Sequence, residues 1–211
     1  MIGQAHKPKA ELRPFRPADI PEVVNLHLSI LPANTGRRFH ERALYPTICH
    51  SASTGYGFVQ VRDGKVVGFI VGIQDTSAWR WTLVRTQGLE CLLAAARLML
   101  KECGAFRKAV KWARRFMTNP SAKPEGHIFA VAIDKPYRSR GLGLQLLQAF
   151  LDYCRFHGMA RLWSMTPKAN AAYRRLVTNC GFRYHGELSI GGESYVVNCL
   201  DFDKSEEADG E

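Results

Sequence analysis

The sequence has few cysteines, and no two of them lie close together. Six are spread along 211 residues, without a C-x-x-C pair and without the histidine spacing of a zinc site. A domain built around disulfides or structural zinc is therefore not expected, and no metal site is predicted. We interpret the cysteines as reduced thiols, several of them buried as small apolar side chains. They are Cys49, Cys91, Cys103, Cys154, Cys180 and Cys199.

Long apolar runs are also missing. The most apolar stretch, residues 89–100, contains Glu90 and Arg97 and is too short to cross a bilayer. Residues 1–15 have no apolar core of the kind found in signal peptides. These features argue against a membrane-spanning or secreted protein and predict a cytoplasmic location.

Acidic residues are outnumbered by basic ones. The chain has 29 Lys and Arg against 19 Asp and Glu, a formal net charge of +10. This excess favours anionic partners: a phosphorylated cofactor, nucleic acid, an acidic substrate or an anionic membrane surface. With 46% hydrophobic and 23% charged residues in 211, the composition is typical of one well-buried globular domain.

Residues 130–156 carry the strongest local pattern. A short run rich in apolar residues ends at Ile133, breaks at Asp134-Lys135-Pro136, and resumes as an apolar pattern of helical period at about Ser139. Gly158 stands where a glycine commonly ends a helix. The pattern predicts a strand, a tight turn and a helix, whose buried stripe consists of Leu146, Leu147, Phe150, Leu151 and Cys154.

The turn between that strand and helix has the sequence R-S-R-G-L-G, residues 138–143. Its glycines let the backbone turn sharply and let a ligand approach, and the first helical amides have no acceptor inside the helix. With Arg138 and Arg140 nearby, a phosphate or pyrophosphate is the expected occupant. The alternative is an ordinary helix start with two solvated arginines.

The order of the following segments resembles the GNAT superfamily of N-acetyltransferases. The matching elements are a strand ending in Val-Ala-Ile, the R-x-x-G-x-G turn, Asn170 at the start of a short helix, and Gly181-Phe182 after that helix. The match covers about residues 128–201. It implies an α/β (α+β) fold with a mixed, mostly antiparallel central sheet, helices on its flanks and splayed central strands.

The resemblance implies transfer of an acetyl or related acyl group from acetyl-CoA to a primary amine in a ternary complex. Coenzyme A would run between the strand ending at Ile133 and the strand at residues 161–166. The backbone of the first strand would hold the pantetheine arm, and the turn would hold the pyrophosphate. The implied coenzyme-binding residues are Val131, Ile133, Arg138, Ser139, Arg140, Gly141, Leu142, Gly143, Asn170 and Tyr173.

A general acid is harder to identify. Many relatives have a tyrosine four residues before the Gly-Phe pair, where this chain has Val177. Tyr173 lies one helical turn earlier on roughly the same face and is the candidate acid. Its alternative role is to pack against the coenzyme or the sheet, and Cys180 is a further candidate.

A general base is not obvious either. Some relatives use a glutamate on the strand before Asn170, where this chain has Met165. His127 and Glu125 are candidates that would act through water. Alternatively His127 is structural, and the reaction depends on substrate positioning alone.

The remaining segments complete the expected organisation. We expect a flexible leader at residues 1–10, a single domain at 11–202 with an enlarged helical segment at about 77–125, and a disordered acidic tail at 203–211. Strands are predicted at 11–16, 57–62, 65–72, 183–190 and 193–201, and helices at 17–31, 36–49, 89–103 and 106–117. The resemblance makes His40, Tyr45 and His50 candidates for facing the acceptor; the alternative is ordinary surface or half-buried residues.

Two other functions stay open. One is a non-catalytic acyl-CoA-binding or regulatory module, since the usual tyrosine is missing. The other is a nucleic-acid-associated protein that uses the basic segment 101–115. That segment also fits a membrane surface, a homodimer contact or a solvated helix face, and the last two are favoured.

Overall fold

All strands of the described chain belong to one sheet. The computed structural model describes residues 10–30, 37–49, 55–74, 76–101, 125–190 and 192–202. The sheet has seven strands in the order β1-β2-β3-β4-β5-β7-β6, and every neighbouring pair is antiparallel except β4 with β5. The strands are β1 Ala10–Pro14, β2 Gly55–Arg62, β3 Lys65–Ile73, β4 Glu125–Ile133, β5 Arg161–Pro167, β6 Arg183–Ile190 and β7 Glu193–Asp201.

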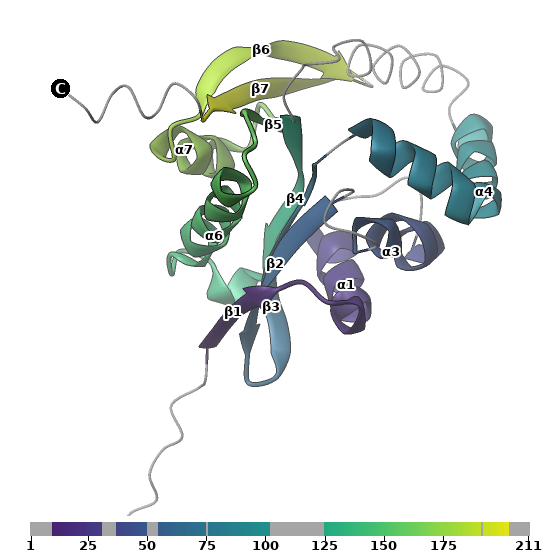
Figure 1. Cartoon of the computed structure of the whole chain (residues 1–211), viewed down its shortest axis with the longest axis horizontal. Helices are drawn as coiled ribbons and strands as arrows, with labels where there is room; N and C mark the ends of the chain where they lie inside the picture. Colours follow the sequence, from purple (N-terminus) through teal and green to yellow (C-terminus); the bar gives the residue numbers. More distant parts are fainter. Residues whose placement is uncertain are drawn as a thin grey trace, which may run out of the picture.

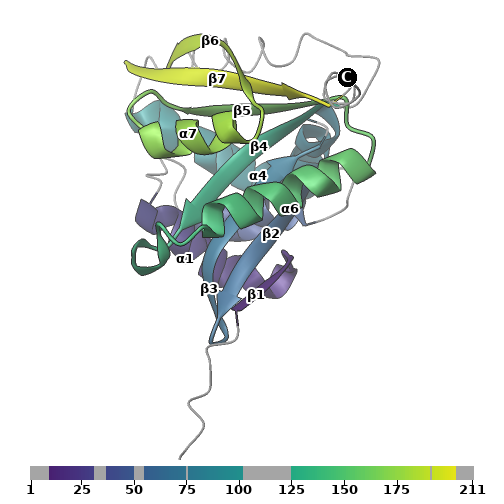
Figure 2. The same ribbon diagram turned by 90° about the vertical axis from the view of Figure 1, so that its left-hand side faces the viewer.

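Helices cover both faces of this sheet (Figures 1 and 2). The helices α6 and α7 lie on one face, and α1, α3 and α4 lie on the other. One apolar cluster, centred on Phe150, packs under α6 and α7, and a second, centred on Phe69, packs under α1 and α3. The helices are α1 Ile20–Ile30, α2 Arg37–Phe39, α3 Tyr45–Ile48, α4 Thr76–Lys101, α6 Leu142–Phe156 and α7 Ala171–Asn179, with a π-helical turn at His40–Leu44 between α2 and α3.

The strands β4 and β5 pair along only part of their length. Residues 125–128 pair with residues 161–164 in parallel, and the two strands then continue without pairing to each other. The register between β3 and β4 shifts at the same level, because Gly72 faces Ile128 while Val71 faces Ala130, which leaves Phe129 as an extra residue in β4. Such a bulge increases the local twist of a strand. The predicted splaying of the central strands is thereby confirmed.

Two glycines of β3 lie where α6 packs on the sheet. A Cβ at Gly72 would collide with the ring of Phe150, and a Cβ at Gly68 would lie 2.5 Å from Cδ1 of Ile133. The sequence analysis did not predict which neighbour these strand glycines accommodate. The structure shows that it is the inner face of α6 and the adjacent strand.

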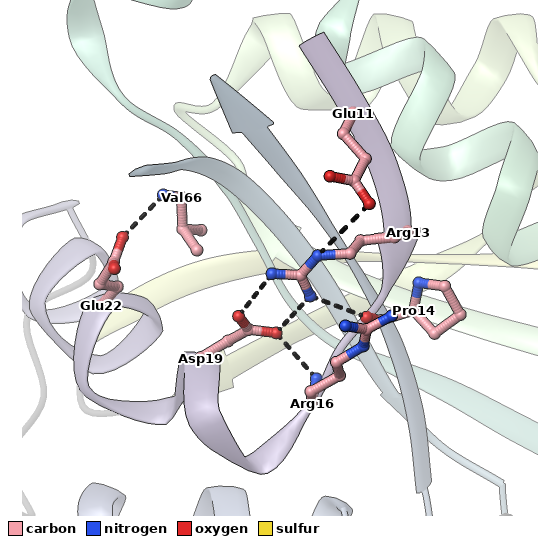
Figure 3. Close-up of polar contacts among 7 residues, drawn as sticks. All are labelled: Glu11, Arg13, Pro14, Arg16, Asp19, Glu22 and Val66. Carbon is pink, nitrogen blue, oxygen red and sulfur yellow. Dashed lines mark hydrogen bonds and ion pairs between the residues drawn. The ribbon is translucent and has the colours of Figure 1, made fainter. Parts of the chain in front are cut away.

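A buried ion pair fixes the first strand to the first helix (Figure 3). Arg13 on β1 donates two hydrogen bonds to Asp19, at 2.7 and 2.8 Å, and Asp19 also accepts the backbone N–H of Arg16 at 2.9 Å. Glu22 on α1 accepts the backbone N–H of Val66 at 2.7 Å, which attaches the helix to β3. Although burial alone would raise the pKa of Asp19, the hydrogen bonds from Arg13 and from the backbone of Arg16 hold it below its ordinary value of 3.8.

The predicted fold class is confirmed, and several boundaries differ. The long helix α6 begins at Leu142 rather than at Ser139, because Ser139 and Gly141 have φ of 60° and 77°. The helix predicted at 36–49 is divided by the π-helical turn. The helix predicted at 89–103 corresponds to the second part of α4, because the dihedral angles of Gln87 divide α4 into two helices, and the first part, from Thr76, was not predicted. Residues 1–9, 102–124 and 203–211 lie outside the described residues, so the flexible leader, the basic helix and the acidic tail stay predictions.

Candidate active site

The turn that follows β4 presents backbone amides at the start of α6. A short 3-10 helix at Lys135–Tyr137 leads into it, and Gly141, with φ of 77°, precedes the first helical residue. The N–H of Gln145 donates to the carbonyl of Gly141 at 3.1 Å. The amides of Leu142, Gly143 and Leu144 therefore precede the first intrahelical donor and point out of the helix end. A Cβ added to Gly141 would meet nothing within 4 Å, so the space beside this amide is open.

The two arginines of the turn lie in different places. Nε of Arg138 donates to the carbonyl oxygen of Ile133 at 2.9 Å, so this side chain folds back on the end of β4. The guanidinium of Arg140 lies over the ring of Tyr137, 5.8 Å from its centroid, and that of Arg62 lies 5.9 Å from the same centroid. Arg138 and Arg140 are exposed and keep positive charge close to the helix end.

The edge of β4 carries backbone groups that face the gap between the splayed strands. The N–H of Asp134 donates to the carbonyl of Val67 on β3 at 2.9 Å. Because backbone groups alternate in direction along a strand, those of Val131 and Ile133 point the other way, toward β5. These residues lie beyond the last pair between β4 and β5. Their backbone groups therefore have no partner on β5 in the described chain.

Tyr173 reaches the point where the two strands separate. Its hydroxyl oxygen lies 3.0 Å from Oγ of Ser164, and Ser164 is the last residue of β5 that pairs with β4. Asn170 caps α7, since its Oδ1 accepts the backbone N–H of Tyr173 at 3.1 Å. Burial raises the pKa of Tyr173 to about 12 although the hydrogen bond with Ser164 lowers it, so the phenol carries its proton at neutral pH.

Val177 occupies the position where many relatives have a tyrosine, and it is fully buried in the core beneath α7. A side chain at that position faces the core in this chain. Cys180, at the end of α7, is half-buried, and burial raises the pKa of its thiol. Of these three residues, Tyr173 is the one whose polar atom contacts the end of the paired segment.

The opposite face of β4 carries the candidate bases. Glu125 accepts Nε1–H of Trp163 at 2.8 Å and a hydrogen bond from Arg161 at 3.3 Å, so donors surround this carboxylate. His127 pairs in register with Trp163, beside Glu125. Burial lowers the pKa of His127 to about 4, although the charge of Glu125 acts in the other direction. The imidazole is therefore neutral at pH 7 and has one nitrogen without a proton.

Residues 20–182 match the model of the acetyltransferase (GNAT) family. The chain belongs to this family. The predicted resemblance is confirmed, and the match extends well before the segment that carried it.

Curated relatives match this GNAT chain over a shorter stretch. It is 30% identical over 82 residues to the ribosomal protein bS18 alanine N-acetyltransferase of Escherichia coli K12, over 36% of this chain and 55% of that protein. The same enzyme of Shigella flexneri matches equally. The chain thus spans about half the length of the curated relatives it matches.

Solved structures show the same fold over nearly the whole chain. The ribosomal-protein-S18-alanine N-acetyltransferase of Escherichia coli has a TM-score of 0.58 at 15% identity and covers 92% of this chain and 94% of its own. Arabidopsis thaliana NAA60 in complex with acetyl-CoA has a TM-score of 0.62 at 14% identity, covering 92% and 99%. A NatC complex bound to Gag peptide and CoA has a TM-score of 0.62 at 12% identity, with the same coverage. At these identities the likeness establishes the GNAT fold and nothing finer.

The structure corrects the prediction for two acceptor-site candidates. His40 and Tyr45 are 3% and 0% exposed, and the hydroxyl of Tyr45 lies 2.6 Å from Nδ1 of His27 inside the core. They are neither acceptor contacts nor surface residues. The resemblance suggested an exposed position for both, whereas His40 shares the buried side of the turn with Ala43 and Leu44. His50 lies outside the described residues.

Sequence reasoning missed Ser164 and Trp163. Both lie in a short apolar strand, where a single serine gives no signal of its own, and their importance comes from partners distant in the sequence.

In the described part of the chain, no group of three His, Cys, Asp or Glu residues is placed to hold a metal ion. None of the described helices is long and apolar enough to cross a bilayer.

Proposed function

We propose that this protein transfers an acetyl group from acetyl-CoA to a primary amine, by direct attack in a ternary complex. The observation that carries the proposal is the position of the Tyr173 hydroxyl, held by Ser164 where β4 and β5 separate. A coenzyme whose arm lies between the splayed strands would bring its thioester to this point.

Each part of the coenzyme has a matching part of the chain. The pantetheine arm would pair with the outward-facing backbone of Val131 and Ile133, and an amide there would polarise the thioester carbonyl. The pyrophosphate would lie on the amides of residues 139–143, beside Arg138 and Arg140. The side-chain nitrogen of Asn170 would reach the arm, since its Oδ1 already caps α7.

The reaction needs one proton removed and one supplied. The amine nitrogen attacks the carbonyl carbon, the C–N bond forms, the C–S bond breaks, and the departing thiolate takes the proton of Tyr173. His127, neutral because burial lowers its pKa to about 4, would take the proton of the amine through water and release it to solvent. Glu125 would orient the side chains beside His127, since it already accepts hydrogen bonds from Trp163 and Arg161.

For the acceptor, we propose a panel that begins with peptide α-amines. A curated relative is named as an alanine N-acetyltransferase of ribosomal protein bS18, and a structural relative was solved with a peptide and CoA. Small amines and amino sugars belong in the same panel. We further propose that the enzyme uses no metal and is cytoplasmic. The free thiols of Cys49, Cys91, Cys154, Cys180 and Cys199 fit a reducing compartment.

The test is release of coenzyme A thiol from acetyl-CoA with each amine of the panel. Thiol release with an amine that is itself acetylated supports the proposal. Thermal stabilisation by acetyl-CoA without turnover on any amine would instead favour the regulatory module. Salt-sensitive binding of RNA or DNA, lost when the lysines and arginines of residues 101–115 are neutralised, would support the nucleic-acid hypothesis. Sedimentation of the same samples would determine whether the protein is a homodimer.

A further inference from the structure

A buried polar group lies behind the hydroxyl of Ser164. Asn198 on β7 faces Ser164 directly in the antiparallel register of β5 and β7. Both residues are nearly inaccessible, with 2% of Ser164 and 5% of Asn198 exposed. Residues directly opposite on neighbouring strands have Cβ atoms about 5 Å apart and project from the same face of the sheet. Asn198 therefore lies next to Ser164, on the face that α7 covers.

The side-chain amide of Asn198 has an unsatisfied hydrogen-bond donor. Within the described chain, its Nδ2 is buried and has no hydrogen-bond partner. An unsatisfied buried donor is costly, and native proteins retain few of them. The register of β5 and β7 places Ser164 directly opposite Asn198, and Oγ of Ser164 in turn contacts the hydroxyl of Tyr173.

We infer that Asn198 and Ser164 form a chain of hydrogen-bond donors that positions Tyr173 and stabilises its phenolate, so that both are positioning residues for proton transfer to the departing thiolate. This inference rests on the proposed function. Nδ2–H of Asn198 donates to Oγ of Ser164 through one buried water, since the two atoms share no direct hydrogen bond, and the Ser164 hydroxyl donates to Tyr173. Each donor in such a chain polarises the next.

Proton transfer from Tyr173 to a thiolate needs such hydrogen-bond donors. Burial raises the pKa of Tyr173 to about 12, which makes the phenol a weaker acid than an ordinary thiol, with its pKa of about 8.5. Proton transfer to a thiolate is then unfavourable unless something stabilises the phenolate that remains. Hydrogen bonds donated to a charged form do so. Reprotonation of the phenolate from solvent completes the cycle.

Other groups around Tyr173 do not serve this purpose. The thiol of Cys180 is the other titratable group that acts on the phenol, and its charge would oppose ionisation. The apolar members of the same cluster, among them Leu176 and Val177, donate no hydrogen bond to a phenolate. In the described chain, the hydrogen bond at the phenol oxygen is the one with Ser164 on β5.

The experiment compares Ser164→Ala with Ser164→Thr. We expect Ser164→Ala to lower kcat about tenfold, less than loss of the acid itself, with little change in KM for acetyl-CoA. Ser164→Thr keeps a hydroxyl and should restore most of kcat. Thr47→Ala is the matched control: it removes a buried hydroxyl from α3 on the opposite face, and should affect only thermal stability.

A second measurement does not require turnover. With 3-fluorotyrosine incorporated and the Tyr173 signal assigned by Tyr173→Phe, fluorine NMR follows ionisation of the phenol. Ser164→Ala and Asn198→Ala should each shift it to higher pH, and the double variant should shift it by less than the sum of the two. An unchanged titration in Ser164→Ala would overturn the inference while leaving the proposed function intact. A shifted titration in a protein that acetylates no amine would refute the proposed function and keep the donor chain.

Discussion

Tyr173 lies one helical turn before Val177 on α7. Val177 is buried in the core, whereas the hydroxyl of Tyr173 lies 3.0 Å from Oγ of Ser164, beside the gap between β4 and β5. Under the proposed function, a phenol at this position would meet the departing thiolate, one turn away from the tyrosine of many relatives.

Replacing Tyr173 with Phe removes this proton and keeps the ring. General acid catalysis contributes at least about 100-fold, so kcat should fall by about that factor, with KM for acetyl-CoA nearly unchanged. Thiol release at saturating amine measures the effect. An equal loss in Tyr184→Phe, an exposed tyrosine on β6, would indicate a general disturbance instead.

Gly141 allows a sharper test of the phosphate turn. A leucine there must adopt the φ of 77° and would fill the open space beside the amides, so coenzyme affinity should fall at least tenfold. Gly64, in the turn between β2 and β3, has the same φ of 77° and also open space around it. Gly64→Leu should therefore cost similar stability and leave affinity, measured by calorimetry, unchanged.

Local signals in the sequence predicted some site residues and not others. Asn170 and Gly141 were predictable because a cap and a left-handed turn each depend on a single residue type. Ser164 and Asn198 were not, because their importance comes from a register between strands separated by two other elements. His40 and Tyr45 were misplaced because the family resemblance, and no local signal, suggested that they face the acceptor, whereas both are buried in the core.

Packing of α6 on the sheet depends on the missing side chain at Gly72. In Gly72→Ala, the new methyl would collide with Phe150 and lie 2.8 Å from the carbonyl oxygen of His127. Overpacking of this kind should lower the free energy of unfolding by about 2 kcal/mol, as measured in urea. Phe150→Leu in the same chain should recover part of this loss. Gly88→Ala in α4, with nothing within 4 Å, is the control and should not destabilise.

The attachment of β1 to α1 should depend on pH. In the folded protein the pKa of Asp19 lies below its ordinary value of 3.8. The contribution of Asp19 to the free energy of unfolding is therefore complete above pH 3.8, and it is lost as the pH falls through the folded pKa. Asp19→Asn should cost about 2 kcal/mol at pH 7 and little at pH 2. Glu22→Gln, an exposed neighbour in Figure 3, should change stability much less. Equal losses at both pH values would show that the charge is irrelevant.

Periodicity and turn residues predicted most elements of the fold. Asp63 and Gly64, with φ of 50° and 77°, form the tight hairpin expected of an Asp-Gly pair. The extra residue Phe129 and the early start of α4 were not predicted. A bulge depends on the partner strand, and the helical pattern of residues 76–88 is weakened by polar residues and a glycine.

The sheet as a whole consists of two halves joined by a short ladder. Strands β1 to β4 form one half and β5, β7 and β6 the other, and residues 125–128 and 161–164 make the backbone connection between them. Few hydrogen bonds need to break for one half to open relative to the other. Such sub-global opening is what amide hydrogen exchange detects.

A coenzyme arm paired with Val131 and Ile133 would lengthen that connection and couple the two halves into one cooperative unit. Saturating acetyl-CoA should then slow amide exchange in β5 and β7 as well as in β4. Adenosine 3′,5′-bisphosphate, which has phosphates and no pantetheine arm, should protect the turn at residues 139–143 and leave β5 and β7 unchanged. The gap in the sheet would thus make the rigidity of the whole protein depend on its own substrate.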